Sequence, residues 1–148
     1  MKFFTYLMGR LHRRAPVQIA ATRPPPPEDR GFDRLEIQGV IIEHLEWCVA
    51  FNDHLSMDPA DTAQRPALPG PAESGLGRWL ARALERAEGR HSLLVELRDE
   101  YEQFHRLANQ ALSHARADQM HLASTLLNTD FERRRARVLE MLRTLQRR

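Results

Sequence analysis

Two pairs of side chains in this sequence combine metal-binding or proton-transferring chemistry with the spacing of an α-helix. His44 and Cys48 are four residues apart, and so are Tyr101 and His105. On a helix, this spacing places both members of a pair on one face, about 6 Å apart along the axis. Helices that face each other in a bundle build metal sites from inward-pointing residues of this kind. These four residues are therefore the candidate site of the chain.

Each pair belongs to a row of mainly apolar residues with helical periodicity. The first row predicts a helix over residues 33–57 and consists of Ile37, Ile41, His44, Cys48, Phe51 and Leu55. The second row predicts a helix over residues 91–115 and consists of Leu94, Leu97, Tyr101, Phe104, His105, Ala108 and Leu112. Because the remaining members of both rows are apolar, we expect the two pairs to face the core.

Two further helices complete the expected fold. Apolar residues at positions 76, 79, 80, 83 and 84 predict a short amphipathic helix, which the pair Glu88-Gly89 is expected to end. A last helix is expected to begin at a capping box formed by Thr129 and Glu132, and residues 116–127 either extend the preceding helix or form a short one. Four prolines between residues 59 and 71 predict a long crossover loop, and no strand-like alternation occurs. The sequence thus predicts an all-α, antiparallel four-helix bundle.

Composition limits the domain organisation of the 148-residue chain. Residues 24–27 are consecutive prolines, which favour a polyproline spacer and exclude a helix. We therefore expect residues 1–31 to form a flexible, basic, Pro-rich tail and residues 32–148 to form the bundle. The single cysteine excludes an intramolecular disulfide and favours a reducing, cytoplasmic location.

Charge is distributed unevenly along the chain. Residues 1–31 carry six basic and two acidic residues, residues 32–130 carry nine and sixteen, and residues 131–148 carry seven and two. An acidic body argues against nucleic-acid binding by the body, and no apolar stretch is long enough for a membrane span. The basic ends leave open an adaptor that binds nucleic acid or a membrane surface. The basic last helix also suits docking on the acidic body of a second copy.

Three motifs resemble the chemoreceptor zinc-binding domain, a bacterial cytoplasmic four-helix module. Residues 43–47 read Glu-His-Leu-Glu-Trp, residues 74–80 read Ser-Gly-Leu-Gly-Arg-Trp-Leu, and residues 101–105 read Tyr-Glu-Gln-Phe-His. The resemblance covers about residues 33–146. It implies a sensor of zinc or oxidant that signals to an attached domain, with one zinc held by three histidines and a cysteine. His44 and His105 match the first and last of those histidines.

Two of the four ligand positions carry different residues in this chain. Ser74 stands where the resemblance implies the cysteine, and Tyr101 stands where it implies a histidine. Neither hydroxyl is ionised near neutral pH, so both are much poorer zinc ligands than a thiolate or an imidazole. Thiol-based sensing through this position is also lost, because Ser74 has no sulfur. We therefore expect zinc binding to be weak or lost.

Two arrangements remain open for the cluster. In the first, no metal is present and the hydroxyls of Ser74 and Tyr101 hydrogen-bond to the two imidazoles. In the second, His44, Cys48 and His105 hold zinc in a displaced site, with water or Tyr101 as the fourth ligand. The first arrangement is favoured, because it requires no ion and fills a similar volume.

Other residues have structural explanations. Trp47 and Trp79 lie on or beside apolar rows and are expected to anchor the core. Gly75 and Gly77 suit a tight helix start rather than a phosphate loop, because no strand precedes them. No nucleophile, base and orienting acid fit together in the helical pattern, so no enzyme activity is expected. The remaining histidines are expected at the surface or at helix ends; they are His54, His91, His114 and His121.

These features together predict a cytoplasmic bacterial sensory or regulatory helical module of the zinc-binding chemoreceptor-domain type. We expect it to act through protein–protein contacts, either with a partner protein or as a homodimer. The first alternative is a zinc sensor that uses His44, Cys48 and His105. The second alternative is an adaptor that binds nucleic acid or a membrane through its basic ends.

Overall fold

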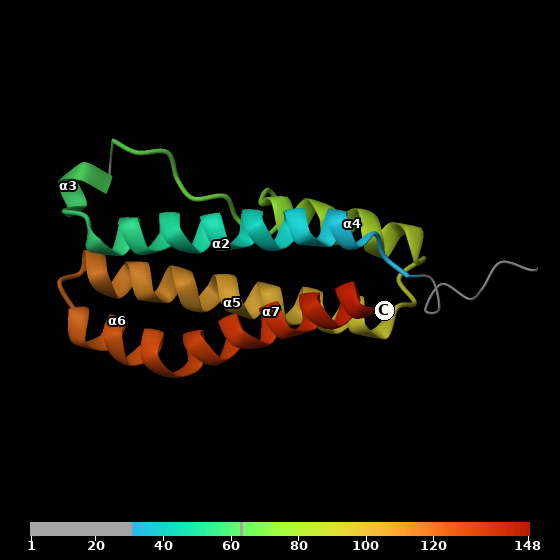
Figure 1. Ribbon diagram of the computed structural model, residues 1–148. Helices are drawn as coiled ribbons and strands as arrows, with labels where there is room; N and C mark the ends of the chain where they lie inside the picture. Colours follow the sequence, from blue (N-terminus) through green and yellow to red (C-terminus); the bar gives the residue numbers. More distant parts are fainter. Residues whose placement is uncertain (1–30, 63) are drawn as a thin grey trace, which may run out of the picture.

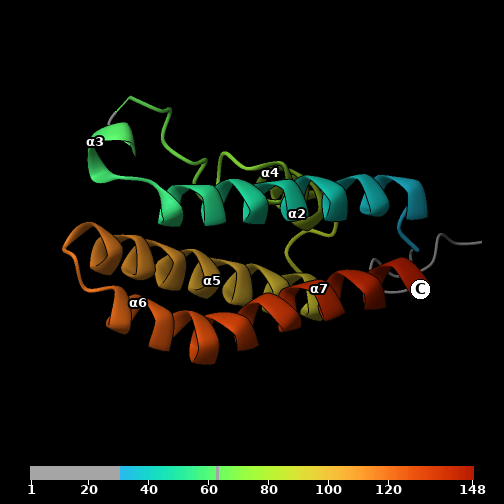
Figure 2. The same cartoon turned by 60° about the vertical axis from the view of Figure 1, so that its left-hand side comes forward.

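Four helical columns pack side by side, and successive columns run in opposite directions (Figures 1 and 2). A computed structural model describes residues 31–148 apart from residue 63. The described residues contain helices and no strands, so the predicted all-α class is confirmed. The predicted tail, residues 1–31, lies outside the described residues except for Gly31. The columns consist of α2 (Arg34–Ser56), α4 (Gly75–Arg86), α5 (Ser92–Arg116), and α6 (Met120–Leu126) continued by the π-helical η2 (Leu127–Phe131) and α7 (Glu132–Arg147).

Local capping groups determine where the helices begin and end. The Asp33 carboxylate accepts a hydrogen bond from the Leu35 N–H at 2.8 Å, which satisfies one of the free donors at the start of α2. After the C-terminal end of α4, Glu88 and Gly89 adopt left-handed φ values of 54° and 69°. The Gly89 N–H then donates to the Leu84 carbonyl at 2.8 Å. The helix therefore ends where the Glu-Gly pair predicted.

The connection between α2 and α4 is the predicted crossover loop, with one short helix inside it. This helix, α3, spans Pro59–Thr62, after which the chain runs back along α2 to the start of α4 (Figure 1). The Trp47 indole N–H donates to the Pro69 carbonyl at 2.9 Å and so ties the loop to α2. Because α4 has only 12 residues, it accompanies one part of α2 and the loop accompanies another (Figure 1).

The predicted capping box at Thr129 and Glu132 is wrong. The Thr129 hydroxyl donates to the Thr125 carbonyl at 2.7 Å, and the backbone stays helical from Met120 to Arg147. The buried Ala123 and the buried Phe131 are eight positions apart, which would offset them by about 80° around a regular α-helix. The extra residue of the π-turn brings both onto the core side. Of the two predicted alternatives for residues 116–127, the separate short helix is confirmed, because the chain leaves the helical conformation at residues 117–119 and α6 begins at Met120.

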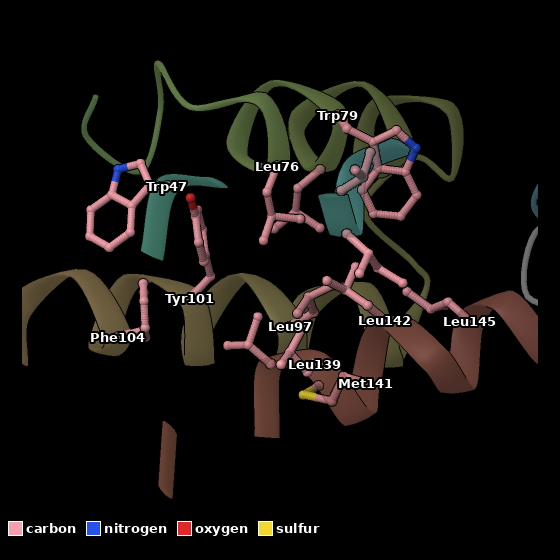
Figure 3. Close-up of a cluster of buried hydrophobic side chains, with 14 of the residues drawn as sticks. Trp47, Leu76, Trp79, Leu97, Tyr101, Phe104, Leu139, Met141, Leu142 and Leu145 are labelled. Atoms are coloured by element: carbon pink, nitrogen blue, oxygen red, sulfur yellow. The ribbon is translucent and has the colours of Figure 1, made fainter. Parts of the chain in front are cut away.

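The core runs along the axis of the bundle and includes side chains from all four columns. Trp79 is 1 % exposed and Trp47 is 8 % exposed, so both are core anchors as predicted. Figure 3 shows Tyr101 rising from α5 between Trp47 and Leu76, with its hydroxyl toward the start of α4. None of the helices in the described residues combines the length and the apolar character needed to cross a bilayer.

Candidate functional site

Ser74 and Tyr101 form the centre of the candidate site. The Ser74 Oγ and the Tyr101 hydroxyl oxygen are 2.5 Å apart, a short hydrogen bond between buried groups. Ser74 is also the N-cap of α4, where its Oγ accepts a hydrogen bond from the Gly77 N–H at 3.0 Å. The two hydroxyls therefore bond to each other, and the predicted bonds from these hydroxyls to the imidazoles are wrong. The reason is that the start of α4 holds the serine directly above Tyr101.

His44 lies on the core side of α2 and is 1 % exposed. Its ring contacts Tyr101 and Phe104 edge to face, with ring centroids 5.8 and 5.2 Å apart. Its Nε2 is 3.9 Å from the Cys48 Sγ, and its Nδ1 has no hydrogen-bond partner among the described residues. The predicted pairing of His44 with Cys48 on one helix face is therefore confirmed, although Cys48 is only half-buried.

His105 lies on α5, one turn after Tyr101, and is 3 % exposed. Its ring stands nearly perpendicular to Tyr101, with centroids 4.6 Å apart, and lies 4.7 Å from the centroid of Trp47. Its Nε2 is buried and has no hydrogen-bond partner among the described residues. Both histidines thus contact Tyr101 through their rings.

Burial keeps the ionisable groups of the cluster uncharged. It lowers the pKa of His44 to about 4 and that of His105 to about 4, because a charged imidazole loses its hydration in the core. It raises the pKa of the Cys48 thiol to about 11 and that of Tyr101 to about 12 for the same reason. At neutral pH the site is a neutral, largely apolar cluster with two imidazoles, one thiol and two hydroxyls.

The candidate ligands of the cluster are not gathered into one three-ligand group in the described residues. Cys48 lies next to His44, but His105 does not join them in a three-ligand group. In the part of the chain that the structure describes, no three His, Cys, Asp or Glu side chains are grouped so as to hold a metal ion. Zinc takes thiolate and imidazole ligands in tetrahedral sites, and of the three predicted ligands the structure brings His44 and Cys48 next to each other. Weak or lost zinc binding therefore stays a prediction.

Two glycines let the loop and α2 approach the start of α4 closely. A Cβ on Gly77 would lie 1.6 Å from the Pro71 carbonyl oxygen, and one on Gly75 would lie 1.5 Å from a carboxylate oxygen of Glu43. Only glycine fits at position 77, where the neighbouring atom is a backbone carbonyl, whereas at position 75 the Glu43 side chain would have to move. The close approach brings Ser74 within reach of Tyr101.

One of the scattered histidines has a buried structural role. His91 is the N-cap of α5, and its Nδ1 accepts a hydrogen bond from the Leu94 N–H at 3.4 Å. It is 1 % exposed and its ring packs 5.5 Å from that of Phe32. The prediction of a helix-end position is confirmed, but a surface position is wrong for His91, because the Phe32 ring covers it.

The outer face of α2 carries a row of exposed apolar side chains that the sequence reasoning missed. Leu35, Ile42 and Val49 are 83, 48 and 62 % exposed, and Leu45 beside them is 41 % exposed. Three of the four are separated by seven residues, and this regular spacing is the signal that identifies them. Below, these four side chains are called the α2 row.

Arginines of the basic last helix pair with acidic side chains of α5. Arg134 Nη1 lies 2.8 Å from a Glu100 carboxylate oxygen, and Arg137 Nε lies 3.2 Å from the other oxygen. Arg137 also lies 3.8 Å from Glu96. Part of the basic charge on α7 therefore stabilises the bundle itself.

Comparison of this chain with known protein families, curated proteins and solved structures finds no match. The likeness to the chemoreceptor zinc-binding domain stays a prediction carried by residues 43–47, 74–80 and 101–105.

Proposed function

We propose that this chain is a cytoplasmic bacterial regulatory module of the zinc-binding chemoreceptor-domain type, which works through protein–protein contacts. In this proposal a neutral hydrogen-bonded cluster occupies the place of the metal site. The module responds to a binding partner and not to zinc.

The Ser74–Tyr101 hydrogen bond is the observation that carries the proposal. The two positions at which the resemblance implies a cysteine and a histidine ligand are 27 residues apart in sequence, yet their hydroxyls are 2.5 Å apart. Each hydroxyl thereby gains a partner, so the cluster needs no ion to satisfy them. A neutral hydrogen bond contributes about 1 kcal/mol to stability, whereas a structural zinc contributes about 10 to 16 kcal/mol. In this proposal, packing of the apolar core and not a metal ion stabilises the fold.

The α2 row supports the protein–protein part of the proposal. Isolated exposed apolar residues are common on protein surfaces, whereas exposed apolar residues gathered on one face of one helix favour an interaction surface. Of the large exposed apolar residues in the described part of the chain, Leu35, Ile42, Leu45 and Val49 all belong to α2. A partner helix packed along this row would cover them.

The zinc content of the protein tests the metal part directly. Tag-free protein purified without chelator is analysed by elemental mass spectrometry, before and after incubation with zinc and desalting. We expect a value near zero, and we expect a chelator to leave the melting temperature unchanged. About one zinc per chain that is lost in both Cys48→Ala and His105→Ala would overturn the proposal and establish the rearranged site of His44, Cys48 and His105.

A gain-of-binding variant tests the resemblance itself. The double variant Ser74→Cys/Tyr101→His combines a thiol and an imidazole with His44 and His105, which completes the ligand set that the resemblance implies. We expect this variant to bind about one zinc per chain and to become more resistant to heat when zinc is added. A folded double variant that binds no zinc would contradict the family assignment.

A further inference from the structure

The α2 row forms an apolar strip on a helix whose opposite face packs in the core, with Gly39 between Leu35 and Ile42 and Glu46 between Ile42 and Val49. From Leu35 to Val49 the strip is about 21 Å long, at 1.5 Å per residue. Gly39 lies between them at the surface, and a Cβ there would meet no atom within 4 Å. The strip therefore has room for a second chain segment along its whole length.

Acidic side chains surround the strip, and they lack basic partners. Glu36, Glu43, Glu46 and Asp53 are all exposed on α2. None of the four forms an ion pair with a basic side chain of the described residues, in contrast to the acidic residues of α5 that α7 neutralises. A segment that is apolar on one side and basic on its flanks matches this face in both respects.

Arg78 and Arg82 of α4 border the same face. They line a groove between α2 and α4 together with Leu35, Glu36 and Glu43. The basic charge of α4 thus lies beside the N-terminal half of the strip. Glu46 and Asp53 lie further along α2, and neither of them lines the groove with these arginines. The flanking positive charge of an occupant should therefore gather near Glu46 and Asp53.

One segment of this chain has the matching pattern. Four of its apolar residues follow the i, i+3, i+4, i+7 spacing of one helix face and are Phe4, Leu7, Met8 and Leu11, whereas Phe3 and Tyr6 fall outside that face. In the same helical register Arg10 and Arg14 flank the face, and Lys2 and Arg13 lie opposite it. Residues 1–30 lie outside the described residues, and Gly31 is three residues before the start of α2. Residues 15–30 can span up to about 50 Å at 3.1 Å per residue, which is more than the strip requires.

A second copy of α2 is a poorer occupant. In a symmetric pair the same faces meet, so the acidic residues of one copy would lie against those of the other. Like charges placed together across an interface oppose association. An anionic membrane surface is disfavoured for the same reason. Charge thus selects the basic segment from these three occupants.

We propose that residues 3–14 bind back onto the outer face of α2 in the same chain. The apolar side of the segment covers the α2 row, and the flanking Arg10 and Arg14 lie near Glu46 and Asp53. This inference deepens the proposed function, because a partner protein that uses the α2 row must first displace the segment. The position of the segment is measurable whether or not such a partner exists, so the two proposals fail separately.

Photo-cross-linking of the full-length chain tests the position of the segment. The variant Phe4→p-benzoylphenylalanine places the probe on the apolar side of the segment; it is irradiated, and the cross-linked sites are located by tandem mass spectrometry. We expect the cross-links to fall within residues 35–53 of α2 and the product to have the mass of one chain. Irradiation of a mixture of isotopically light and heavy chains should give products with one isotope only. Products that combine light and heavy chains would assign the segment to a second copy and overturn the proposal.

Surface variants provide the second readout. Ile42→Glu and Val49→Glu each place a charge on the strip without disturbing the core, and either should reduce the cross-link yield about tenfold. Leu122→Glu is the matched control, since Leu122 is a 40 % exposed apolar residue on α6 and should leave the yield unchanged. Circular dichroism confirms that each variant is folded. Cross-links that avoid α2, or a yield that Ile42→Glu and Val49→Glu leave intact, would overturn the proposal.

Discussion

Removing either hydroxyl of the Ser74–Tyr101 hydrogen bond should destabilise the fold, but removing that of Ser74 should cost more. Ser74→Ala removes the α4 cap, worth about 1 kcal/mol, and leaves the Tyr101 hydroxyl buried without a partner, which costs about 1 to 3 kcal/mol. We therefore expect a loss of about 2 to 4 kcal/mol in the free energy of unfolding. Tyr101→Phe removes only the shared bond, because Ser74 still accepts from Gly77, and should cost about 1 kcal/mol.

Combining the two substitutions isolates the energy of the pair. In Ser74→Ala/Tyr101→Phe no hydroxyl remains unpaired, so the double variant should lose about 1 to 2 kcal/mol less than the two single losses added together. Urea unfolding followed by tryptophan fluorescence gives each value, provided that the slope with denaturant stays constant. Ser56→Ala is the matched control: Ser56 is exposed at the end of α2, and its hydroxyl donates only to the Asn52 carbonyl.

The control should change stability by less than about 0.5 kcal/mol. The reasoning is refuted if Ser74→Ala costs no more than this control. Strictly additive losses in Ser74→Ala and Tyr101→Phe would also refute it, because additivity means that the two hydroxyls do not depend on each other.

Three further predictions concern acid, backbone crowding and thiol reactivity. The unfolded chain protonates His44 and His105 near pH 6.5 and the folded chain only near pH 4, so stability should fall as the pH drops from about 6.5 to 4, by about 3 kcal/mol for His44. Urea unfolding across this range checks it, and a flat profile would contradict it. Gly77→Ala should cost about 2 kcal/mol or more in the same assay, because the Pro71 carbonyl occupies the Cβ position. Cys48 should react with iodoacetamide about a hundredfold more slowly in the folded chain at pH 8 than in urea, given its raised pKa.

Gly75→Ala is the control for Gly77→Ala. Its new Cβ would meet the end of the Glu43 side chain, which can rotate away, whereas a backbone carbonyl cannot. We therefore expect Gly75→Ala to cost clearly less than Gly77→Ala. Equal losses would mean that the crowding at Pro71 is not the cause.

The bounds of the two long helices could be predicted from the sequence to within about one residue, because their signals are local. The row from Ile37 to Leu55 predicted a helix over residues 33–57, and α2 spans Arg34–Ser56. Burial of one face imposes the helical period on the apolar residues, and a cap such as Asp33 acts on N–H groups two or three positions away. Such information is complete within a short window of sequence.

The capping box failed because a local motif competed with distant packing. Thr129 and Glu132 have the right spacing, but Phe131 between them stacks on Phe51 of α2 and contacts Phe104 of α5. The packing keeps the backbone helical through this region, with one π-turn to correct the face. The sequence window around Thr129 contains no information about those two rings.

Residue types and spacing alone determined that His44, Cys48, Tyr101 and His105 belong to facing helical rows. Tertiary structure decided which atoms meet, because contacts between columns depend on how α4 approaches α5. Ser74 is held above Tyr101 by the glycine-lined start of α4, so the hydroxyls bond to each other and leave the imidazoles in ring contacts. The same holds for the α2 row, whose apolar pattern is visible in the sequence. Its exposure is a property of the assembled bundle, since no other column packs over that face.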